Sequence, residues 1–129
     1  MKISQKQLEA VTALPGPKRY RHFVKVVADQ EKVWGLYNNG WALAATNDEN
    51  LTVFPVWPAL EYAELCRAST WPDCTPKPIE IDEFIGTVIP ELREEGIKLC
   101  IFYLANNRGV VPEYDEFLND LNSALAQYE

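Results

Sequence analysis

The spacing of apolar residues predicts an amphipathic helix that begins near Pro17. Four apolar side chains follow at the i, i+3, i+4, i+7 spacing of one helix face: Tyr20, Phe23, Val24 and Val27. Pro17 suits the first turn, because an N–H there has no partner within the helix. Four cations share the segment, and we expect them to form a solvated basic face: Lys18, Arg19, Arg21 and Lys25.

Similar patterns predict four more helices. Ser4 with Gln7 fits a capping box for a short first helix that ends at residues 14–17. Another helix is expected over 59–67, and a last one opens at Pro112. The apolar stripe after Asp82 predicts a helix up to Gly96, and Pro90 should kink it by removing one backbone hydrogen bond.

The segment VWGLYNNGWALAA, residues 33–45, predicts a β-hairpin with a two-residue type I′ turn at Asn39-Gly40. That register places Trp34, Leu36, Trp41 and Leu43 on one face, which we expect to close against the helix that carries Tyr20. A turn at Asn38-Asn39 would slip the register and change this division. Large aromatic rings are more often buried than displayed, so the hairpin is interpreted mainly as architecture.

Further strands are expected at 51–54, 79–81, 97–105 and 110–111. Pro55 should end the first of these, and residues 69–78 should be irregular. Residues 97–105 are apolar on both faces, which is typical of a central strand. The sequence therefore predicts a single α+β domain over 1–129, with a mostly antiparallel sheet of five to six strands and about five helices.

The chain of 129 residues carries a net charge of −7, and the charge is unevenly distributed. Residues 1–32 hold a balance of +4 and residues 33–129 a balance of −11. An acidic body argues against nucleic acid as the main partner and suits a basic protein partner. No apolar stretch approaches a membrane span, and no signal peptide is recognised, so we expect a cytoplasmic protein. The oligomeric state stays open, a homodimer included.

The residues that usually carry catalysis are scarce. His22 is the only histidine, and we interpret it as a solvated helix residue. The three cysteines, Cys66, Cys74 and Cys100, have no metal-ligand spacing and suit free thiols. We expect Cys100 in the core, Cys66 half-buried and Cys74 reactive. Phosphate-binding glycine motifs are absent from the sequence, so no cofactor is expected. No metal is expected either, because the cysteine spacing and the single histidine provide no ligand set.

Several segments together resemble a family of small bacterial proteins classified as domain of unknown function 2750. They are LPGPKRYRHFVKVVAD, VWGLYNNGWAL, FPVWPALEYAELC, IEIDEF and RGVV, in chain order. The hairpin and the FPVWP segment are the most specific. The resemblance implies a compact bacterial cytosolic domain and transfers no catalytic residue.

Two functions fit these observations. The first is a non-enzymatic protein-binding module, in the manner of an inhibitor or immunity protein, with Trp71 as an anchor. Its acidic surface would comprise Asp73, Glu80, Glu83, Glu113 and Glu116. The alternative is a small-molecule-binding domain or small enzyme. Its pocket would lie between the hairpin and the 69–78 loop, lined by Tyr37, Trp57, Trp71 and Cys74.

Overall fold

A computed structural model describes residues 3–45, 51–104 and 109–127 of the chain. The sequence predicts a polar loop over 46–50 and a turn over 106–109, and all of the loop and most of the turn lie outside the described residues. The elements are α1 (Gln5–Thr12), α2 (Gly16–Gln30), β1 (Lys32–Tyr37), β2 (Ala44–Ala45), β3 (Thr52–Val56), α3 (Leu60–Ser69), β4 (Thr75–Glu80), α4 (Ile81–Glu83), η1 (Phe84–Val88), α5 (Ile89–Glu95), β5 (Lys98–Ile101) and α6 (Tyr114–Ala126). Since α4, η1 and α5 are continuous, the described chain has five helical segments, and the α+β class is confirmed.

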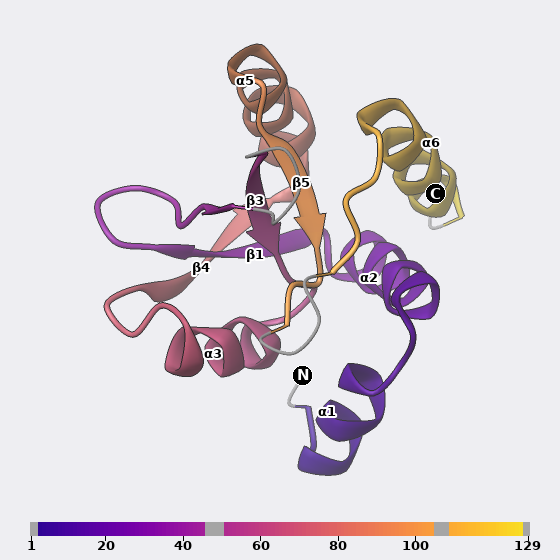
Figure 1. Ribbon diagram of the computed structural model, residues 1–129. Coiled ribbons are helices and arrows are strands. Elements are labelled where there is room, and N and C mark those ends of the chain that lie inside the picture. Colours follow the sequence, from indigo (N-terminus) through magenta and orange to yellow (C-terminus); the bar gives the residue numbers. More distant parts are fainter. Residues whose placement is uncertain (1–2, 46–50, 105–108, 128–129) are drawn as a thin grey trace.

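The strands form two small sheets rather than the expected sheet of five to six strands. β1 pairs with β4, and β3 lies between β2 and β5. An isolated antiparallel bridge joins the sheets, with Trp34 N–H donating to the Trp57 carbonyl at 2.9 Å and Trp57 N–H to the Trp34 carbonyl at 2.8 Å. Figure 1 shows β3 and β5 through the centre, with β1 and β4 to one side and α2 and α6 to the other.

The partner of β1 is β4, not the hairpin segment that follows it. The two strands are antiparallel and run in register from Lys32 opposite Glu80 to Tyr37 opposite Thr75. The sequence concealed β4 because Pro76 and Pro78 lie within it, and proline is normally a signal against a strand. An edge strand tolerates proline, because its outer N–H groups need no partner, and β4 is paired on one side only in the described sheet.

The turn after β1 also differs from the expected two-residue turn. Tyr37 pairs with Trp41, so the loop holds three residues, and Asn39 takes the left-handed conformation with φ 56°. Gly40 has no positive φ, which rules out the type I′ turn. Ala42 N–H still donates to the Leu36 carbonyl at 2.8 Å; beyond it the chain leaves β1, and Ala44 pairs with Val53 of β3 instead. Leu43, expected on the buried face, is 43% exposed.

β3 continues through Pro55 to Val56, where we expected proline to end it. Pro55 is tolerated because β2 pairs only with Thr52 and Val53. At Pro55, β3 therefore has a neighbouring strand on the β5 side alone. β5 runs parallel to β3 and lies at the edge of the three-stranded sheet β2–β3–β5, where we expected a central strand. Its side chains are nevertheless buried from Leu99 to Ile101, and Leu99 and Ile101 belong to the same apolar core as Phe84 and Phe117.

The helix that contains Pro90 accommodates the proline by widening. Residues 84–88 form a π-helical turn, in which the Ile89 N–H bonds to the carbonyl of Phe84. α5 then begins with Pro90 in its first turn, where a missing N–H costs little. The expected defect is therefore a π-bulge one turn before the proline.

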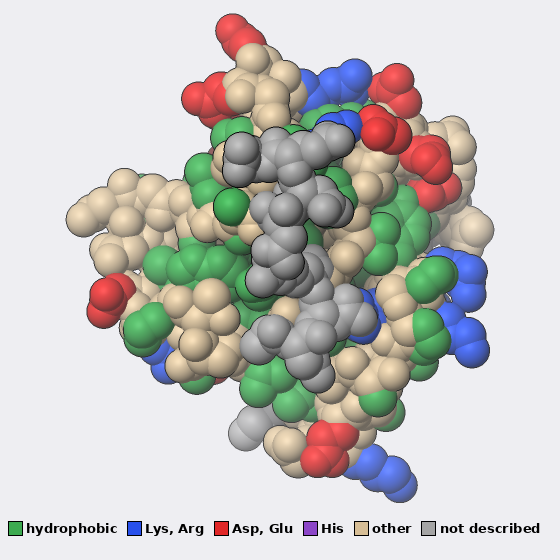
Figure 2. All heavy atoms as spheres, in the orientation of Figure 1, with side chains coloured by type: hydrophobic (Ala, Val, Ile, Leu, Met, Phe, Trp, Pro, Cys, Tyr) green, Lys and Arg blue, Asp and Glu red, His purple; other side chains and the backbone are tan. Residues whose placement is uncertain are grey.

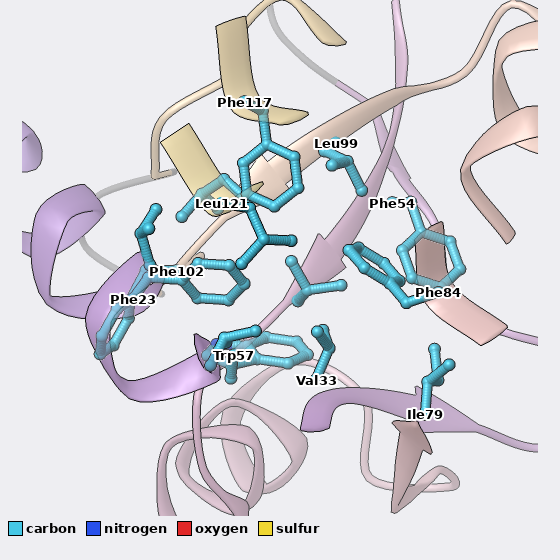
Figure 3. Close-up of a cluster of buried hydrophobic side chains, with 14 of the residues drawn as sticks. Phe23, Val33, Phe54, Trp57, Ile79, Phe84, Leu99, Phe102, Phe117 and Leu121 are labelled. Atoms are coloured by element: carbon cyan, nitrogen blue, oxygen red, sulfur yellow. The ribbon is translucent and has the colours of Figure 1, made fainter. Parts of the chain in front are cut away.

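One apolar core connects the elements. Its centre contains aromatic rings from four of them and from the residue that follows β3, namely Phe23, Phe54, Phe84, Phe117 and Trp57, and Figure 3 shows these rings converging with Leu99 and Leu121. Phe117 lies 6.2 Å from both Phe23 and Phe84, between ring centroids. Trp57 is fully buried, while Trp34 and Trp41 are half-buried and pack against the core.

Two further residues are more buried than expected. Arg19, assigned to a solvated face, is 2% exposed, and its Nη1 donates to the Leu14 carbonyl at 2.7 Å. Burial lowers the pKa of Arg19. Cys66, expected to be half-buried, is 1% exposed.

Candidate functional site

A groove of about 910 Å³ runs between α2 and α6. Pro17, Tyr20 and Val24 line it from α2, and Ala124 lines it from α6. The segment Val110–Pro112, which leads into α6, lines it as well. The amphipathic patterns of the two helices explain the position, because both helices bury one stripe in the core and leave the residues beside that stripe at the surface.

The two walls of the groove carry charges of opposite sign. Arg21 and Lys25 project from α2, whereas Glu116 and Asp120 lie along α6 and Glu113 lies at its N-cap. Figure 2 shows hydrophobic side chains at the right of the molecule, with acidic groups above them and basic groups beside them, where α6 and α2 lie in Figure 1. The groove therefore combines an apolar floor with a basic and an acidic wall.

A hydrogen bond between the walls fixes their separation. The Tyr20 hydroxyl donates to Asp120 Oδ2 at 2.6 Å, and the Tyr20 ring packs edge-on against Phe117. Burial raises the pKa of Tyr20 strongly, and the hydrogen bond to Asp120 and the charges of Asp120 and Glu116 raise it further. Tyr20 is therefore neutral and a hydrogen-bond donor at physiological pH.

Three contacts hold the beginning of α6 in place. Lys98 Nζ pairs with Glu113 Oε2 at 2.7 Å, and Arg93 Nη1 with Asp115 Oδ1 at 3.2 Å. The Tyr114 hydroxyl donates to the Ile97 carbonyl at 2.5 Å. The ion pairs are exposed and contribute little energy, so the buried Tyr114 and Phe117 determine the position of this wall.

A second, smaller hollow of about 260 Å³ lies where α1, α2, β1 and the start of α3 meet. It is lined by apolar side chains, among them Val26, Trp34 and Leu60, and by polar ones that include His22, Lys32 and Glu61. His22 is half-buried rather than solvated, with its ring 6.4 Å from that of Phe102. Burial lowers the pKa of His22, and the charge of Lys25 lowers it further.

Comparison with known proteins gives one family. The family model described as "Protein of unknown function (DUF2750)" matches residues 20–121 of the 129. The chain belongs to the DUF2750 family. No curated protein and no solved structure gives a significant match. The family model matches this DUF2750 chain from Tyr20 to Leu121. The matched region therefore contains the Tyr20–Asp120 pair and most of both groove walls.

The expected aromatic site residues of this DUF2750 chain lie apart from the groove. Tyr37 packs edge-on against Trp41, and the two ring centroids are 5.1 Å apart. Lys77 Nζ lies over the Tyr37 ring, 4.2 Å from its centroid. Trp57 is 0% exposed and donates from Nε1 to the Tyr103 carbonyl at 2.7 Å, so it belongs to the core. Trp71 is half-buried against Trp57, 6.2 Å away between ring centroids.

The expected acidic residues are all exposed but belong to separate segments. Asp73 follows α3, Glu80 ends β4 and Glu83 ends α4. Only Glu113 and Glu116 of this set line the groove. The groove and the smaller hollow are lined by none of the residues that we expected for a pocket between the hairpin and the 69–78 loop.

Sequence reasoning missed most of the groove. Arg21 and Lys25 were recognised as a basic face of α2, and Glu113 and Glu116 as acidic residues near the last helix. What the sequence does not reveal is that α2 and α6 lie side by side, since the end of α2 at Gln30 and the start of α6 at Tyr114 are far apart in the chain. The signal in the sequence that could have indicated the groove was the apolar segment Val110–Pro112 directly before a helix with acidic residues.

Within 3–45, 51–104 and 109–127, no cluster of three or more His, Cys, Asp or Glu residues is arranged to hold a metal ion. In the same ranges, no helix is both long and apolar enough to cross a membrane.

Proposed function

We propose that this protein is a binding module whose α2–α6 groove holds an amphipathic helix of a protein partner. The observation that carries the proposal is the apolar floor between a basic and an acidic wall. Helix-in-groove recognition uses such a combination, with apolar anchors for affinity and charged edges for orientation.

The apolar lining gives the groove its capacity to hold a helix. Val24 and Ala124 line it from opposite helices, and Val111 is 38% exposed at one side. An exposed apolar patch bordered by charge is typical of a surface that is covered in a complex. A helix lying there would pack against α2 and α6 as a third helix, at the usual interaxial distance of about 8–10 Å.

The opposite charges of the walls determine what the partner helix must carry. Acidic side chains on one edge would face Arg21 and Lys25, and basic side chains on the other would face Glu116 and Asp120. Reversing the direction of a helix that lies on its apolar face exchanges its two edges. The walls therefore select both the charge pattern and the direction of the bound helix.

The net charge of −7 adds a long-range contribution to this recognition. A partner with net positive charge would associate faster, and the rate would fall as salt increases, because the screening length at 0.15 M ionic strength is about 8 Å. A basic protein that exposes one such helix is the partner that both observations favour.

A designed helical peptide tests the proposal directly. The peptide has an apolar stripe, lysine on one edge and glutamate on the other; two comparison peptides carry lysine on both edges or glutamate on both. We expect the mixed peptide to bind at least about tenfold more tightly than either comparison peptide, because each of those places like charges against one wall. Isothermal calorimetry measures the affinities.

Variants of the protein locate the site. Ser123→Trp should fill the groove from its exposed rim and abolish binding, and Glu116→Lys should weaken binding of the mixed peptide several-fold. Glu9→Lys makes the same charge change on the exposed surface of α1 and should leave the affinity unchanged. Equal binding of all three peptides, or undiminished binding to Ser123→Trp, would refute the proposal.

A further inference from the structure

The strand β4 has one edge that pairs with β1 and one edge, called here the outer edge, without a neighbouring strand among the described residues. Thr75, Lys77, Pro78 and Glu80 are exposed, so the strand lies at the surface. β4 is six residues long, which is the usual length of a strand in a sheet. An exposed edge of this length is normally a template for a strand of another chain, because its outward N–H and C=O groups are unpaired.

The pairing with β1 shows which backbone groups of β4 point to the outer edge. In an antiparallel pair, residues that bond to the opposite strand alternate with residues whose N–H and C=O groups point away from it. Trp34 of β1 is of the second kind, because both of its backbone groups bond to Trp57, and the Leu36 carbonyl also bonds on that side. The residues opposite them in β4 are Pro78 and Pro76. The backbone groups of both prolines therefore point to the outer edge.

Prolines at these two positions remove the hydrogen-bond donors of the outer edge. A proline nitrogen carries no hydrogen, so between Thr75 and Glu80 the edge offers the carbonyl oxygens of Pro76 and Pro78 and no N–H group. No backbone N–H of the described residues outside β1 donates to either carbonyl. A strand added at this edge would leave its own carbonyls without donors, so it would make only half of the usual hydrogen bonds.

The ladder between β1 and β4 is not disturbed by the prolines. Pro76 and Pro78 take outward positions, whereas Thr75, Lys77 and Ile79 take the positions that bond to β1. A proline at one of those three positions would remove a donor from the ladder. Proline fixes φ near −65°, which extended backbone accepts, so the two outward prolines cost the strand little. The outer edge is thus blocked without loss of the pairing with β1.

Lys77 adds a repulsive charge at the same edge. In the register that pairs Pro76 of one copy with Pro78 of a second copy, the two Lys77 residues lie directly opposite each other. Like charges at opposite positions of an antiparallel pair are destabilising. This contribution is smaller than the loss of the donors, because the exposed ammonium group is screened by solvent.

We propose that Pro76 and Pro78 prevent two copies of this chain from associating through the outer edge of β4. Without them, β4 of one copy would pair antiparallel with β4 of the second, and the two-stranded sheets would join in the order β1–β4–β4–β1. A second copy is the partner that the block excludes, because an antiparallel pair of identical strands has the two-fold symmetry of a closed dimer. The proposal does not rest on the function assigned to the α2–α6 groove.

Restoring the two donors tests the proposal. Pro76→Thr combined with Pro78→Thr should leave the fold intact, because the new N–H groups point outward and threonine favours strands. In analytical ultracentrifugation, the double variant should self-associate at least about tenfold more tightly than the unmodified chain. The matched control is Pro72→Thr, at an exposed position in the segment between α3 and β4, and it should behave as the unmodified chain does.

Amide hydrogen exchange locates the contact in the double variant. The amide hydrogens that the substitutions create at positions 76 and 78 should exchange rapidly in dilute solution and become protected as the protein concentration rises. Pro78→Thr alone restores one donor at an exposed position and should strengthen self-association less than the double substitution.

Two results would overturn the proposal. One is a double variant that circular dichroism shows to be folded and that keeps the mass of the unmodified chain up to about 1 mM, where a dimer with a Kd near 1 mM is detectable. The other is self-association in which the two new amide hydrogens stay unprotected. If the double variant does not fold, Pro78→Thr decides by the same two measurements.

Discussion

The hydroxyl of Tyr20 and the carboxylate of Asp120, one hundred residues apart in the chain, form a hydrogen bond of 2.6 Å between α2 and α6. This bond joins the two walls of the groove at the level where the Tyr20 ring also contacts Phe117. It is thus a structural link between the beginning and the end of the chain and a determinant of the shape of the groove.

Removing this hydroxyl should destabilise the protein modestly. Tyr20→Phe keeps the ring contact with Phe117 but loses one hydrogen bond to a charged acceptor. We expect a loss of about 1–2 kcal/mol in the free energy of unfolding, measured by urea denaturation. Tyr37→Phe is a suitable control, because the Tyr37 hydroxyl makes none of the described hydrogen bonds, and it should change stability by less than about 0.5 kcal/mol. Equal effects of the two substitutions would contradict the assigned role of the bond.

Stability should fall at alkaline pH because of Tyr114. Burial raises the pKa of Tyr114 from 10.0 to about 12, so the fold favours the protonated hydroxyl, which donates to the Ile97 carbonyl. A pKa raised by folding contributes stability that is complete below pH 10 and is lost as the pH rises through 12.

The substitution Tyr114→Phe separates this contribution from other alkaline effects. It should cost about 1 kcal/mol near neutral pH, because the hydrogen bond is lost. It should also make the decline in stability between pH 10 and 12 less steep than in the unmodified protein, as followed by circular dichroism in urea. An unchanged slope would show that other groups dominate the decline.

The three thiols should differ in reactivity. Cys66 and Cys100 are each 1% exposed, and burial raises the pKa of Cys100 to about 12, so very little reactive thiolate forms there. Cys74 is partly exposed in the segment between α3 and β4. Mass spectrometry after brief maleimide treatment should show one label on the folded protein, at Cys74, and three after unfolding. Comparable labelling of all three in the folded state would contradict the burial of Cys66 and Cys100.

Two glycines should respond in opposite ways to replacement by alanine. A Cβ atom on Gly35 would lie 2.9 Å from Cζ3 of Trp41, so Gly35→Ala must displace that ring and should cost about 1–3 kcal/mol. Gly86 lies in a helical segment where an added Cβ meets nothing within 4 Å. Gly86→Ala should stabilise the protein by about 0.5–1 kcal/mol, because alanine loses less backbone entropy in a helix. Thermal denaturation measures both changes.

Local sequence signals predicted the helices well. The Ser4 side chain accepts from the Gln7 N–H, as the capping box predicted, and Pro17 lies in the first turn of α2. The amphipathic stripe of α2 buries Phe23 and Val27 completely. These features depend on contacts within a few residues, which is why a single sequence is sufficient to predict them.

The strand pairing could not be derived in the same way. The Asn39-Gly40 signal located a turn, but the register and the true partner of β1 depend on residues 75–80, whose prolines conceal a strand. The expected end of a strand at Pro55 was wrong for a related reason. Whether a proline is tolerated in a strand depends on which neighbouring strands are present at that position, and only the folded chain decides this.

The sequence by itself determined the family, the helices, the apolar residues available for a core and the acidic balance of the chain. It did not determine that α2 and α6 lie together, that Arg19 is buried, or that Trp34 borders a hollow while Trp57 is enclosed. Those outcomes arise from packing between segments distant in the chain, where shape and the positions of many side chains act together. The proposed groove and the outer edge of β4 belong to this second group, because each is defined by elements that meet only in the tertiary structure.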